Sequence, residues 1–447
     1  MSFPSSSSLV SLSIYCYNVS GVGKDNLKQI SGKDRTIKMK AFERLLRYTA
    51  IRTPSDEESD TVPSSACQFE LAQHLYRELF TMGITDVKVD TRCYLYAHIP
   101  ATPGYEDRPK LGFIAHLDTV SDFCDHRIIP EIHEDYNGRE LPLGTSGRVL
   151  SPDMFPHLKD LKGRTLITSD GTTILGADDK AGIAEIMTMA ERILDENIPH
   201  GPISIAFTPD EEIGMGAAHF DVEEFGADFA YTLDGDTEGE IQYENFNAAK
   251  AEFQINGVNV HPGSSKDIMI NASLVAMEIN AMLPEGETPR DTDGYEGFYH
   301  LIDMKGDVGH AVLRYIIRDH DAAKFEKRKE TLQDIEKKIN QKWGRGTAVL
   351  TITDQYRNMA EIIAGCMHLI ENAKKACRNA GVTPLILPIR GGTDGAQLSF
   401  KGLPCPNLGT GGHGYHGPYE HITVEGMDAA CEVALELVKI YAEERAD

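Results

Sequence analysis

The chain has 447 residues, of which 41% are hydrophobic and 25% are charged, and its formal net charge is −25 at pH 7. A chain of this length exceeds what one ordinary hydrophobic core spans, so two domains are expected. The negative charge argues against nucleic acids and anionic membranes as partners, because both bind to basic faces. No uninterrupted apolar run approaches the roughly 18 residues of a membrane span. We therefore expect a globular protein with neither nucleic-acid nor membrane partners.

The cysteines indicate a reducing compartment. The sequence contains eight of them, without a CxxC pair or a tightly spaced framework. In a chain of this size, that usage is typical of reduced and mostly buried thiols. The expected location is therefore cytoplasmic.

The first 38 residues differ in composition from the rest of the chain. The segment SFPSSSS is of low complexity, and the short apolar patch LVSLSIYCY follows no basic segment, so a signal peptide fits poorly. We expect residues 1–38 to be a disordered leader or a mis-assigned start. The working protein would then begin near Met39 with an amphipathic helix.

Helices and buried strands alternate as far as residue 246. Near-continuous apolar runs are typical of strands buried on both faces. Their alternation with helices predicts an α/β domain with a largely parallel sheet flanked by helices, which binds ligands beyond the carboxyl ends of the strands. The periodicity predicts helices at 39–51, 67–83 and 180–197 and strands at 86–100, 111–119, 202–212 and 229–236.

The pattern changes between residues 247 and 356, where it predicts a β-α-β-β-α-β unit, a small two-layer domain. Beyond it the first domain resumes. We therefore predict a discontinuous catalytic domain at 39–246 and 357–447, with an inserted lid at 247–356. The expected lid elements are strand 250–257, helix 268–283, strands 297–305 and 309–318, helix 321–343 and strand 347–353, followed by helix 357–381, strand-like 383–389 and helix 424–445.

Five residues of metal-binding type stand at the ends of apolar runs or in nearby loops. Two histidines and three carboxylates make the mixed nitrogen and oxygen ligand set that zinc accepts. Together they predict a centre with two metals, in which a carboxylate that has two oxygens can bridge the ions. The five residues are His116, Asp178, Glu212, Asp234 and His416.

Two further acids stand beside these ligands. Asp118 follows His116 by two residues, so along a strand it shares the same face and can receive the imidazole N–H or orient the site. Glu211 precedes Glu212, and two acids held close together are expected to differ in pKa, as a base and a ligand would.

Each of these signals has a plainer interpretation. Asp178 or Asp179 can cap the following helix, the Glu211–Glu212 pair can be a charged turn, and Asp234 and His416 can be ordinary loop residues. The sequence does not divide the roles of Asp178 and Asp179. The conjunction of all five ligands at inferred sheet ends is what favours a metal centre.

Two other classes of enzyme are disfavoured. The segment GTGGHG at 409–414 matches a dinucleotide-binding pattern, but no helix opens after it. No GxSxG elbow occurs, which argues against a serine hydrolase of the α/β-hydrolase type.

The motifs HLDT, SDGTTILGADDKAGIAEI, TPDEEIG, LDG, HPG, RGGTDGA and GYHGPYEHIT occur in this order from about Met39 to the C-terminus. With them the chain resembles the co-catalytic di-zinc metallopeptidase family that includes aminoacylases and carnosinase-like dipeptidases. The DGTT and RGGTDGA segments resemble its peptidase T branch, the tripeptide aminopeptidases. The resemblance implies a zinc-dependent aminopeptidase that releases the N-terminal residue of tripeptides. Sister activities on dipeptides or N-acyl amino acids, and a non-catalytic binding protein on the same scaffold, remain as alternatives.

The resemblance also implies roles and partners. Two zinc ions would be bound, one by His116 and Asp234 and the other by Glu212 and His416, with Asp178 between them. The peptide bond between Asp178 and Asp179 would be cis. Small peptides would be the substrates, and a lid of the dimerising type makes a homodimer one expectation. The remaining implied roles are Asp118 orienting His116, Glu211 as general base, His261 stabilising the oxyanion and Arg390 binding the substrate carboxylate.

Overall fold

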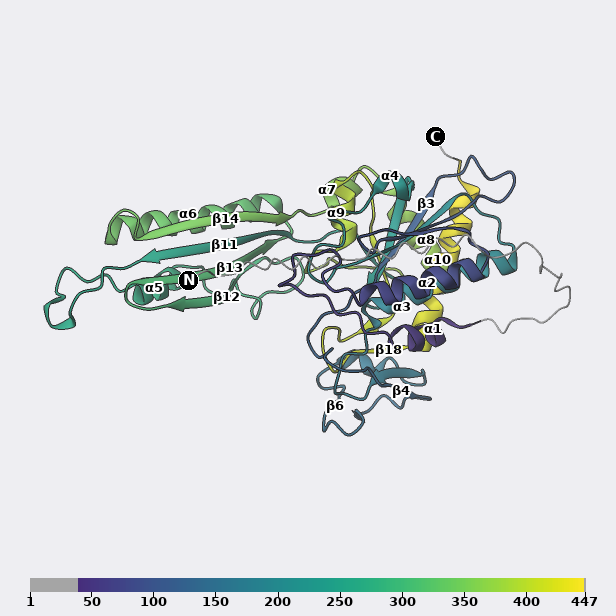
Figure 1. The fold of residues 1–447 in the computed structure, drawn as a ribbon, viewed down its shortest axis with the longest axis horizontal. Helices are drawn as coiled ribbons and strands as arrows, with labels where there is room; N and C mark the ends of the chain where they lie inside the picture. Colours follow the sequence, from purple (N-terminus) through teal and green to yellow (C-terminus); the bar gives the residue numbers. More distant parts are fainter. Residues whose placement is uncertain (1–38, 446–447) are drawn as a thin grey trace, which may run out of the picture. The chain divides into compact units, whose positions relative to one another are not determined.

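The largest sheet of the structure, a computed structural model that describes residues 39–445, has eight strands (Figure 1). Its strand order is β1-β2-β8-β3-β9-β16-β10-β15. The inner strands β8, β3, β9 and β16 run parallel, whereas β1, β2 and β10 pair antiparallel with a neighbour. The expected sheet is therefore present, parallel at its centre and mixed towards its edges. The strands are β1 (Asp86–Val89), β2 (Leu95–Ile99), β8 (Ile203–Thr208), β3 (Leu111–His116), β9 (Phe229–Gly235), β16 (Asn407–Gly409), β10 (Glu240–Gln242) and β15 (Leu385–Ile386).

Helices cover both faces of this sheet. On one face Leu45, Leu71, Ile183 and Leu435 join a large buried core with Phe113 of β3. The opposite face has a smaller core beneath two short helices, α4 and α9. The sheet is therefore buried on both sides, as its apolar strands require. The helices of the first face are α1 (Ala41–Tyr48), α2 (Gln68–Thr81), α3 (Ala177–Glu196), α7 (Ala360–Ile363), α8 (His368–Asn379) and α10 (Val424–Glu443), and those of the second are α4 (Val222–Phe225) and α9 (Asp394–Phe400).

Helix α3 lies unusually close to strand β9. A Cβ atom at Gly182 of α3 would overlap the carbonyl oxygen of Leu233 in β9. Only glycine allows this approach. The contact brings the start of α3, which carries Asp178, next to the strand that carries Asp234.

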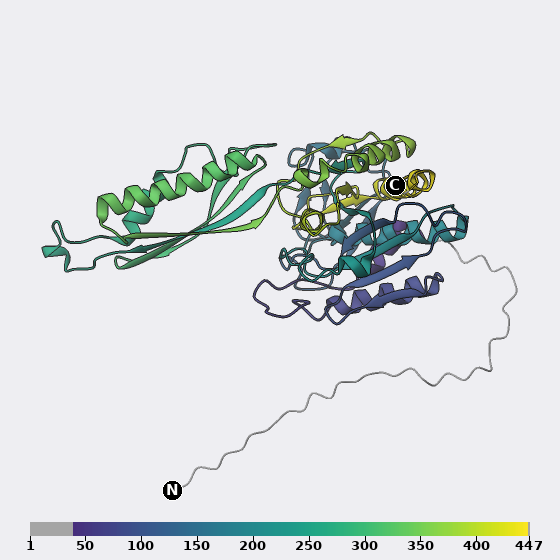
Figure 2. The ribbon, with the colours of Figure 1, turned by 90° about the horizontal axis from the view of Figure 1, so that it is seen from above.

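The segment predicted as a lid forms a second sheet with the strand order β12-β13-β11-β14. All its pairings are antiparallel, and α5 and α6 pack on one face, as Figure 2 shows for α6. Side chains of the sheet, among them Phe253 and Leu313, form a core of their own with helix residues such as Ile335. The elements follow the predicted order: β11 (Asn247–Asn256), η2 (Pro262–Ser264), α5 (Ala272–Ala281), β12 (Phe298–Gly306), β13 (His310–Asp319), α6 (Ala322–Trp343) and β14 (Ala348–Tyr356).

A third, smaller sheet has the order β17-β18-β7-β4. It fixes the base of the loop that carries His416, because β17 and β18 form the two sides of that loop and β18 pairs with β7. The chain between β4 and β7 adds a two-stranded sheet of β5 and β6 and a short 3-10 helix. The elements are β4 (Pro130–His133), β5 (Leu141–Pro142), β6 (Val149–Leu150), η1 (Pro156–Lys159), β7 (Leu166–Ser169), β17 (Gly412–His413) and β18 (His421–Thr423).

Three elements differ from their predicted extents. Residues 86–100 form two strands separated by a turn in which Cys93 has a φ of 73°. The helix predicted at 357–381 is divided into α7 and α8, and the strand predicted at 383–389 is reduced to Leu385–Ile386. For residues 86–100, a continuous apolar pattern hides a local reversal of the chain, because β1 and β2 pair antiparallel.

The described residues contain no helix that is long and apolar enough to cross a membrane. Met39–Asp447 forms one compact unit, so the division of this part into a catalytic domain and a lid at 246/247 and 356/357 stays a prediction. The expectation for residues 1–38 lies outside the described range.

Candidate metal centre

The central parallel strands bring the predicted ligands to one edge of the sheet. His116 is the last residue of β3, and Asp234 stands near the end of the neighbouring β9. Glu212 follows the end of β8, which pairs with β3 on its other side. Because the carboxyl ends of parallel strands meet at the same edge, three segments that are distant in sequence converge there.

Asp178 is shared between the two histidines. Its Oδ1 lies 2.9 Å from Nε2 of His116, and its Oδ2 lies 3.0 Å from Nε2 of His416. The same nitrogen of His116 is 3.5 Å from Oδ1 of Asp234, and that of His416 is 3.1 Å from Oε2 of Glu212. Each oxygen of Asp178 therefore belongs to a different group of three side chains.

These two groups are His116–Asp178–Asp234 and Asp178–Glu212–His416, whose potential ligand atoms lie within 4.8 Å of one another in each group. The observed grouping agrees with the division that the family resemblance implied. The peptide bond between Asp178 and Asp179 is cis, as also implied.

The centre concentrates negative charge in a partly buried place. The side chain of His116 is 2% exposed and that of Asp178 is 13% exposed, whereas that of His416 is 54% exposed. Hydrogen bonds to Asp178 and Glu212 raise the pKa of His416 to about 11. The pKa of His116 also lies well above its usual range: burial opposes the shift, and hydrogen bonds to the surrounding carboxylates outweigh it.

The donor set fits divalent metal ions. Oε1 of Glu212 is buried and has no hydrogen-bond partner among the described residues, so this carboxylate has an unused acceptor inside the centre. Burial of an acceptor without a partner is unfavourable, and a cation would relieve both this cost and the repulsion among the acids. Imidazole nitrogens and carboxylate oxygens in two groups of three are a suitable environment for zinc.

Asp118 supports the centre differently from the simplest expectation. Nδ1 of His116 lies 2.9 Å from the main-chain oxygen of Asp118, closer than the 3.5 Å to its carboxylate. The fully buried carboxylate instead accepts the main-chain N–H groups of Glu211, at 2.9 Å, and Glu212, at 3.2 Å. Asp118 thus contacts the imidazole through its backbone and the Glu211–Glu212 turn through its side chain.

A further acid, Asp210, anchors the same turn from the other side. It is 1% exposed and has a φ of 60°, and its carboxylate accepts the N–H of Ser64 at 2.7 Å and the amide of Gln68 at 2.6 Å. Sequence reasoning did not identify Asp210. The turn that presents Glu211 is therefore fixed on both sides by buried carboxylates.

The carboxylate of Glu211 lies beside the metal-type residues and has no hydrogen bond or ion pair within residues 39–445. Burial, and next the charge of Asp234, raise its pKa well above the usual range of a glutamate. A carboxylate with a raised pKa is a better proton acceptor, which suits a general base.

The two aspartates that the sequence left undivided have separate environments. Asp178 points into the centre, whereas Asp179 is 1% exposed and accepts the N–H of His116 at 3.0 Å. Its other oxygen lies 3.3 Å from the N–H of Gly182, in the manner of a helix N-cap. Asp179 therefore has the capping role, and Asp178 is the candidate bridge.

A cavity of about 230 Å³ opens beside the centre. It combines the metal-type residues with neutral polar groups and one aliphatic side chain, which is a suitable lining for a small polar substrate. Neither Arg390 nor His261 is among the lining residues. They are Asp178, Glu211, Glu212, Asp234, Gly235, Asp236, Gln242, Ile389, Gly392, Thr393, Asn407, Tyr415 and His416.

Arg390 is held by the loop that precedes β12. Its guanidinium donates to the main-chain oxygens of Gly294 at 2.7 Å and Glu296 at 3.0 Å and to Oγ1 of Thr292 at 3.1 Å. It also lies over the ring of Phe246 at 5.2 Å. The neighbouring Ile389 and Gly392 line the cavity, so Arg390 is close in sequence to the site but bonded elsewhere in this structure.

His261 lies on an exposed 3-10 turn of the segment predicted as a lid, as the N-cap of η2. Its Nδ1 accepts the N–H of Gly263 at 3.1 Å. The imidazole is therefore available to solvent. The structure does not bring His261 into the metal centre.

Glu420 is a second buried residue that sequence reasoning missed. It is 1% exposed and accepts three main-chain N–H groups from Leu175, Gly176 and Asp178. The only available signal was its place in the GYHGPYEH segment, four residues after His416.

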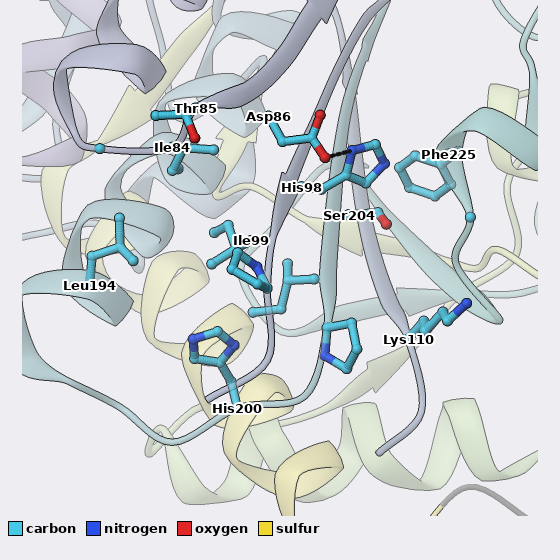
Figure 3. Close-up of a pocket in the computed structure, with 15 residues that line it drawn as sticks. Ile84, Thr85, Asp86, His98, Ile99, Lys110, Leu194, His200, Ser204 and Phe225 are labelled. Atoms are coloured by element: carbon cyan, nitrogen blue, oxygen red, sulfur yellow. Dashed lines mark ion pairs between the residues drawn. The ribbon is translucent and has the colours of Figure 1, made fainter. Parts of the chain in front are cut away.

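A larger cavity, of about 660 Å³, lies elsewhere on the sheet (Figure 3). Figure 3 shows His98 paired with Asp86, with Leu194, His200 and Lys110 along the walls. Neither of the groups of side chains that could hold a metal lies there. The smaller cavity beside Asp178 is therefore the candidate active site.

Comparison with known proteins identifies relatives over most of the chain. Peptidase T of Clostridium perfringens (strain 13 / Type A) is 52% identical over 405 residues, which cover 90% of this chain and 99% of that protein. In fold, the chain resembles aminopeptidase PepT from Bacillus cereus, with a TM-score of 0.72, 24% identity and coverage of 90% and 98% of the two chains. It equally resembles a tripeptidase from Staphylococcus aureus, with a TM-score of 0.72, 22% identity and coverage of 91% and 99%.

A family model described as Peptidase family M20/M25/M40 matches residues 170–440, a range that contains four of the five metal-type residues. Together with the 52% identity to peptidase T over nearly the whole chain, this match means that the protein belongs to the peptidase family M20/M25/M40.

Proposed function

We propose that the protein is a zinc-dependent aminopeptidase that hydrolyses the N-terminal residue from tripeptides. The relatives named peptidase T support the reaction class, and the tripeptidase of similar fold supports the substrate length. Small peptides are accordingly the proposed partners. The cytoplasmic location and the homodimer remain predictions from the sequence.

One observation carries the proposal: the two oxygens of Asp178 face Nε2 of His116 and Nε2 of His416, at 2.9 and 3.0 Å. A carboxylate with one oxygen towards each of two ligand groups is suited to bridge two metal ions. His116 and Asp234 would hold one zinc ion, and Glu212 and His416 the other. When bound, such a pair of ions lowers the pKa of a shared water and polarises the scissile carbonyl.

The side chains of this protein would supply the proton transfers. Glu211 would take a proton from the attacking water and return it to the nitrogen of the leaving peptide. Asp118 and Asp210 would keep Glu211 in place, because Asp118 accepts an N–H of the turn and Asp210, next to Glu211, joins the turn to Ser64 and Gln68. The raised pKa of Glu211 is consistent with this task.

Two residues outside the cavity would act on the substrate at a distance from the acids. Arg390 would bind the C-terminal carboxylate of the peptide, which requires its guanidinium to leave some of the carbonyls of residues 292–296. His261 would donate a hydrogen bond to the developing oxyanion after the lid closes. A cation at a fixed reach from the scissile bond would favour one peptide length.

The proposal is tested by identifying the products from three matched substrates: a free tripeptide, the dipeptide of its first two residues, and the N-acetylated tripeptide. Each is incubated with chelator-treated protein and again after zinc is restored, and the products are separated by HPLC. We expect zinc-dependent release of the N-terminal residue from the free tripeptide alone. Glu211→Gln, loaded with zinc to the same content, serves as the inactive control.

Other outcomes point to specific alternatives. Cleavage of the dipeptide or the acetylated peptide in place of the tripeptide would assign a sister activity to the same centre. Absence of cleavage of all three by the zinc-loaded protein would contradict an aminopeptidase and favour a binding protein on this scaffold.

A further inference from the structure

Two of the metal-type residues come from segments that are far apart in the chain and share no strand pairing of their own. Asp178 follows β7, just inside the start of α3, and His416 lies in the loop between β17 and β18. They are 238 residues apart in sequence, yet Nε2 of His416 lies 3.0 Å from Oδ2 of Asp178. A metal ion bound by both residues requires that these two segments be held next to each other.

Glu420 makes that connection. It stands four residues after His416, at the end of the same loop, and immediately before β18. Its Oε2 accepts the N–H of Leu175 at 2.7 Å and that of Gly176 at 2.8 Å. Its Oε1 accepts the N–H of Asp178 itself at 3.0 Å. One carboxylate thus binds three N–H groups of the segment that presents the candidate bridge.

These N–H groups need an acceptor from outside their own segment. Leu175 and Gly176 precede α3, and Asp178, although within its bounds, has a non-helical φ of −82° and ψ of 106°, so these N–H groups lie outside the regular hydrogen bonds of the helix. Gly176 has no side chain, and its φ of 74° leaves the backbone in the left-handed region. The carboxylate of Glu420 accepts all three N–H groups, and charge-assisted bonds of this kind are stronger than neutral ones.

The loop that carries Glu420 is itself fixed. His421 pairs with Thr168 of β7, and the hydroxyl of Tyr415 donates to the main-chain oxygen of Gly235, next to Asp234. Movement of Glu420 is therefore restricted on both sides. The position of Asp178 relative to His416 depends on a carboxylate that is anchored to the His416 loop.

We propose that Glu420 is a positioning residue of the metal centre, which holds the bridging Asp178 at the correct distance from His416 without touching a metal or the substrate. The inference rests on the proposed two-zinc function. Loss of Glu420 should weaken the two zinc ions to different extents. The ion at Asp178, Glu212 and His416 would depend on both segments that Glu420 joins. The ion at His116, Asp178 and Asp234 would depend on only one of these segments.

The test is a zinc titration of metal-free Glu420→Gln. Glutamine keeps the size of the side chain. Its NH₂ group cannot accept a hydrogen bond, so at least one of the N–H groups bound by the carboxylate loses its acceptor. We expect the affinity of one of the two zinc ions to fall by about 10- to 100-fold, as for other residues that support metal ligands, and that of the other to change by less than about threefold. Titrations of His416→Ala and His116→Ala identify the two steps, and the weakened step should be the one lost in His416→Ala.

Glu425→Gln is the matched control. The carboxylate of Glu425 accepts the N–H of Thr165, at 2.9 and 3.1 Å, and so joins α10 to the residue before β7, at the end of that strand away from Asp178. The substitution removes the same kind of bond between neighbouring segments, and both zinc affinities should stay as in the native protein. The thermal midpoint of every metal-free variant reports any general loss of stability.

Three results would overturn the inference. Glu420→Gln could bind both ions as the native protein does, or it could lose both steps equally in parallel with its thermal midpoint. If the glutamine variant does not fold, Glu420→Asp replaces it, because aspartate keeps the charge on a shorter side chain. This variant must then bind one zinc ion more weakly than the other, relative to the native protein. Unchanged affinity for both ions would again contradict the role. A native protein that binds fewer than two zinc ions would instead refute the proposed two-zinc function.

Discussion

The carboxylate of Asp118 accepts the main-chain N–H of Glu211 at 2.9 Å, although the adjacent His116 is the partner that the sequence suggests. In Asp118→Asn, an NH₂ group would face one of the two N–H groups that the carboxylate accepts. We expect kcat to fall at least about tenfold with zinc saturating. The free energy of unfolding of the metal-free protein should fall by about 1–3 kcal/mol, measured with urea. Unchanged kcat and stability would contradict this role.

Glu211→Gln tests the general base. The side chain keeps its size and loses its ability to accept a proton, so kcat should fall by about 10²–10⁴-fold. The zinc content, measured by elemental analysis, should remain that of the native protein, because Glu211 belongs to neither group of three ligands. A variant that keeps more than about a tenth of kcat would refute the assignment.

His261→Ala tests the contribution of the predicted lid. The imidazole is exposed and accepts the N–H of Gly263 in its own turn, so its removal should leave the thermal midpoint unchanged. Loss of an oxyanion donor should lower kcat by about 10²–10³-fold with little change in KM. His300→Ala, another exposed histidine of the lid, is the control and should keep native kcat. Equal activities of the two variants would exclude the oxyanion role.

Arg390→Ala should raise KM for a free tripeptide and leave KM for the C-terminal amide of the same peptide nearly unchanged. The reason is that only the free peptide offers a carboxylate to the guanidinium. The comparison also separates substrate binding from the structural role of Arg390, because loss of its bonds to residues 292–296 would affect both substrates alike. An identical change in KM for the two peptides would mean that the carboxylate is bound elsewhere.

Three histidines outside the metal centre predict a loss of stability in acid. The rings of His157 and His413 stack with centroids 4.0 Å apart, and Nε2 of His157 lies 2.9 Å from Nε2 of His421. Burial, and next the neighbouring imidazoles, lower the pKa of His413 to about 2, and burial lowers that of His421 to about 4. The pKa of a histidine in an unfolded chain is about 6.5. Below this pH the unfolded state therefore binds protons that the buried histidines of the native state do not bind. Each residue should therefore cost about 1.4 kcal/mol of stability per pH unit as the pH falls, down to its folded pKa.

The measurement is urea unfolding of the metal-free protein between pH 7 and pH 5, for the native chain and for His413→Gln. Because both proteins contain the same groups at the metal centre, the difference between their slopes isolates His413. The variant should lose less stability per pH unit than the native protein. Parallel slopes would show that His413 is not held neutral.

The sequence predicted those parts of the site that leave a local pattern. His116, Asp234 and the Glu211–Glu212 pair follow buried apolar strands, and the rule that parallel strands end at one edge was enough to bring them together. The elements of residues 247–356 were also predictable, because alternation and helical periodicity identify strands and helices one at a time.

Residues that act through main-chain groups of a distant segment were not predictable. Glu420 and Asp210 each accept N–H groups, and an N–H group is present at nearly every position, so its use leaves no mark on the sequence of the donor segment. The main-chain oxygens that bind Arg390 were not predictable for the same reason. The resemblance gave its family role, but local composition could not indicate which loop holds it.

The order of the ligands along the chain has a consequence for biosynthesis. Strand β16 lies between β9 and β10 in the eight-stranded sheet and ends at Gly409. His416 stands only seven residues after Gly409. A nascent chain on the ribosome therefore lacks both an interior strand of the sheet and the candidate ligand His416 until the elements from β1 to β15 have been added. Chains that stop before β16 contain neither, and we expect them to lack peptidase activity.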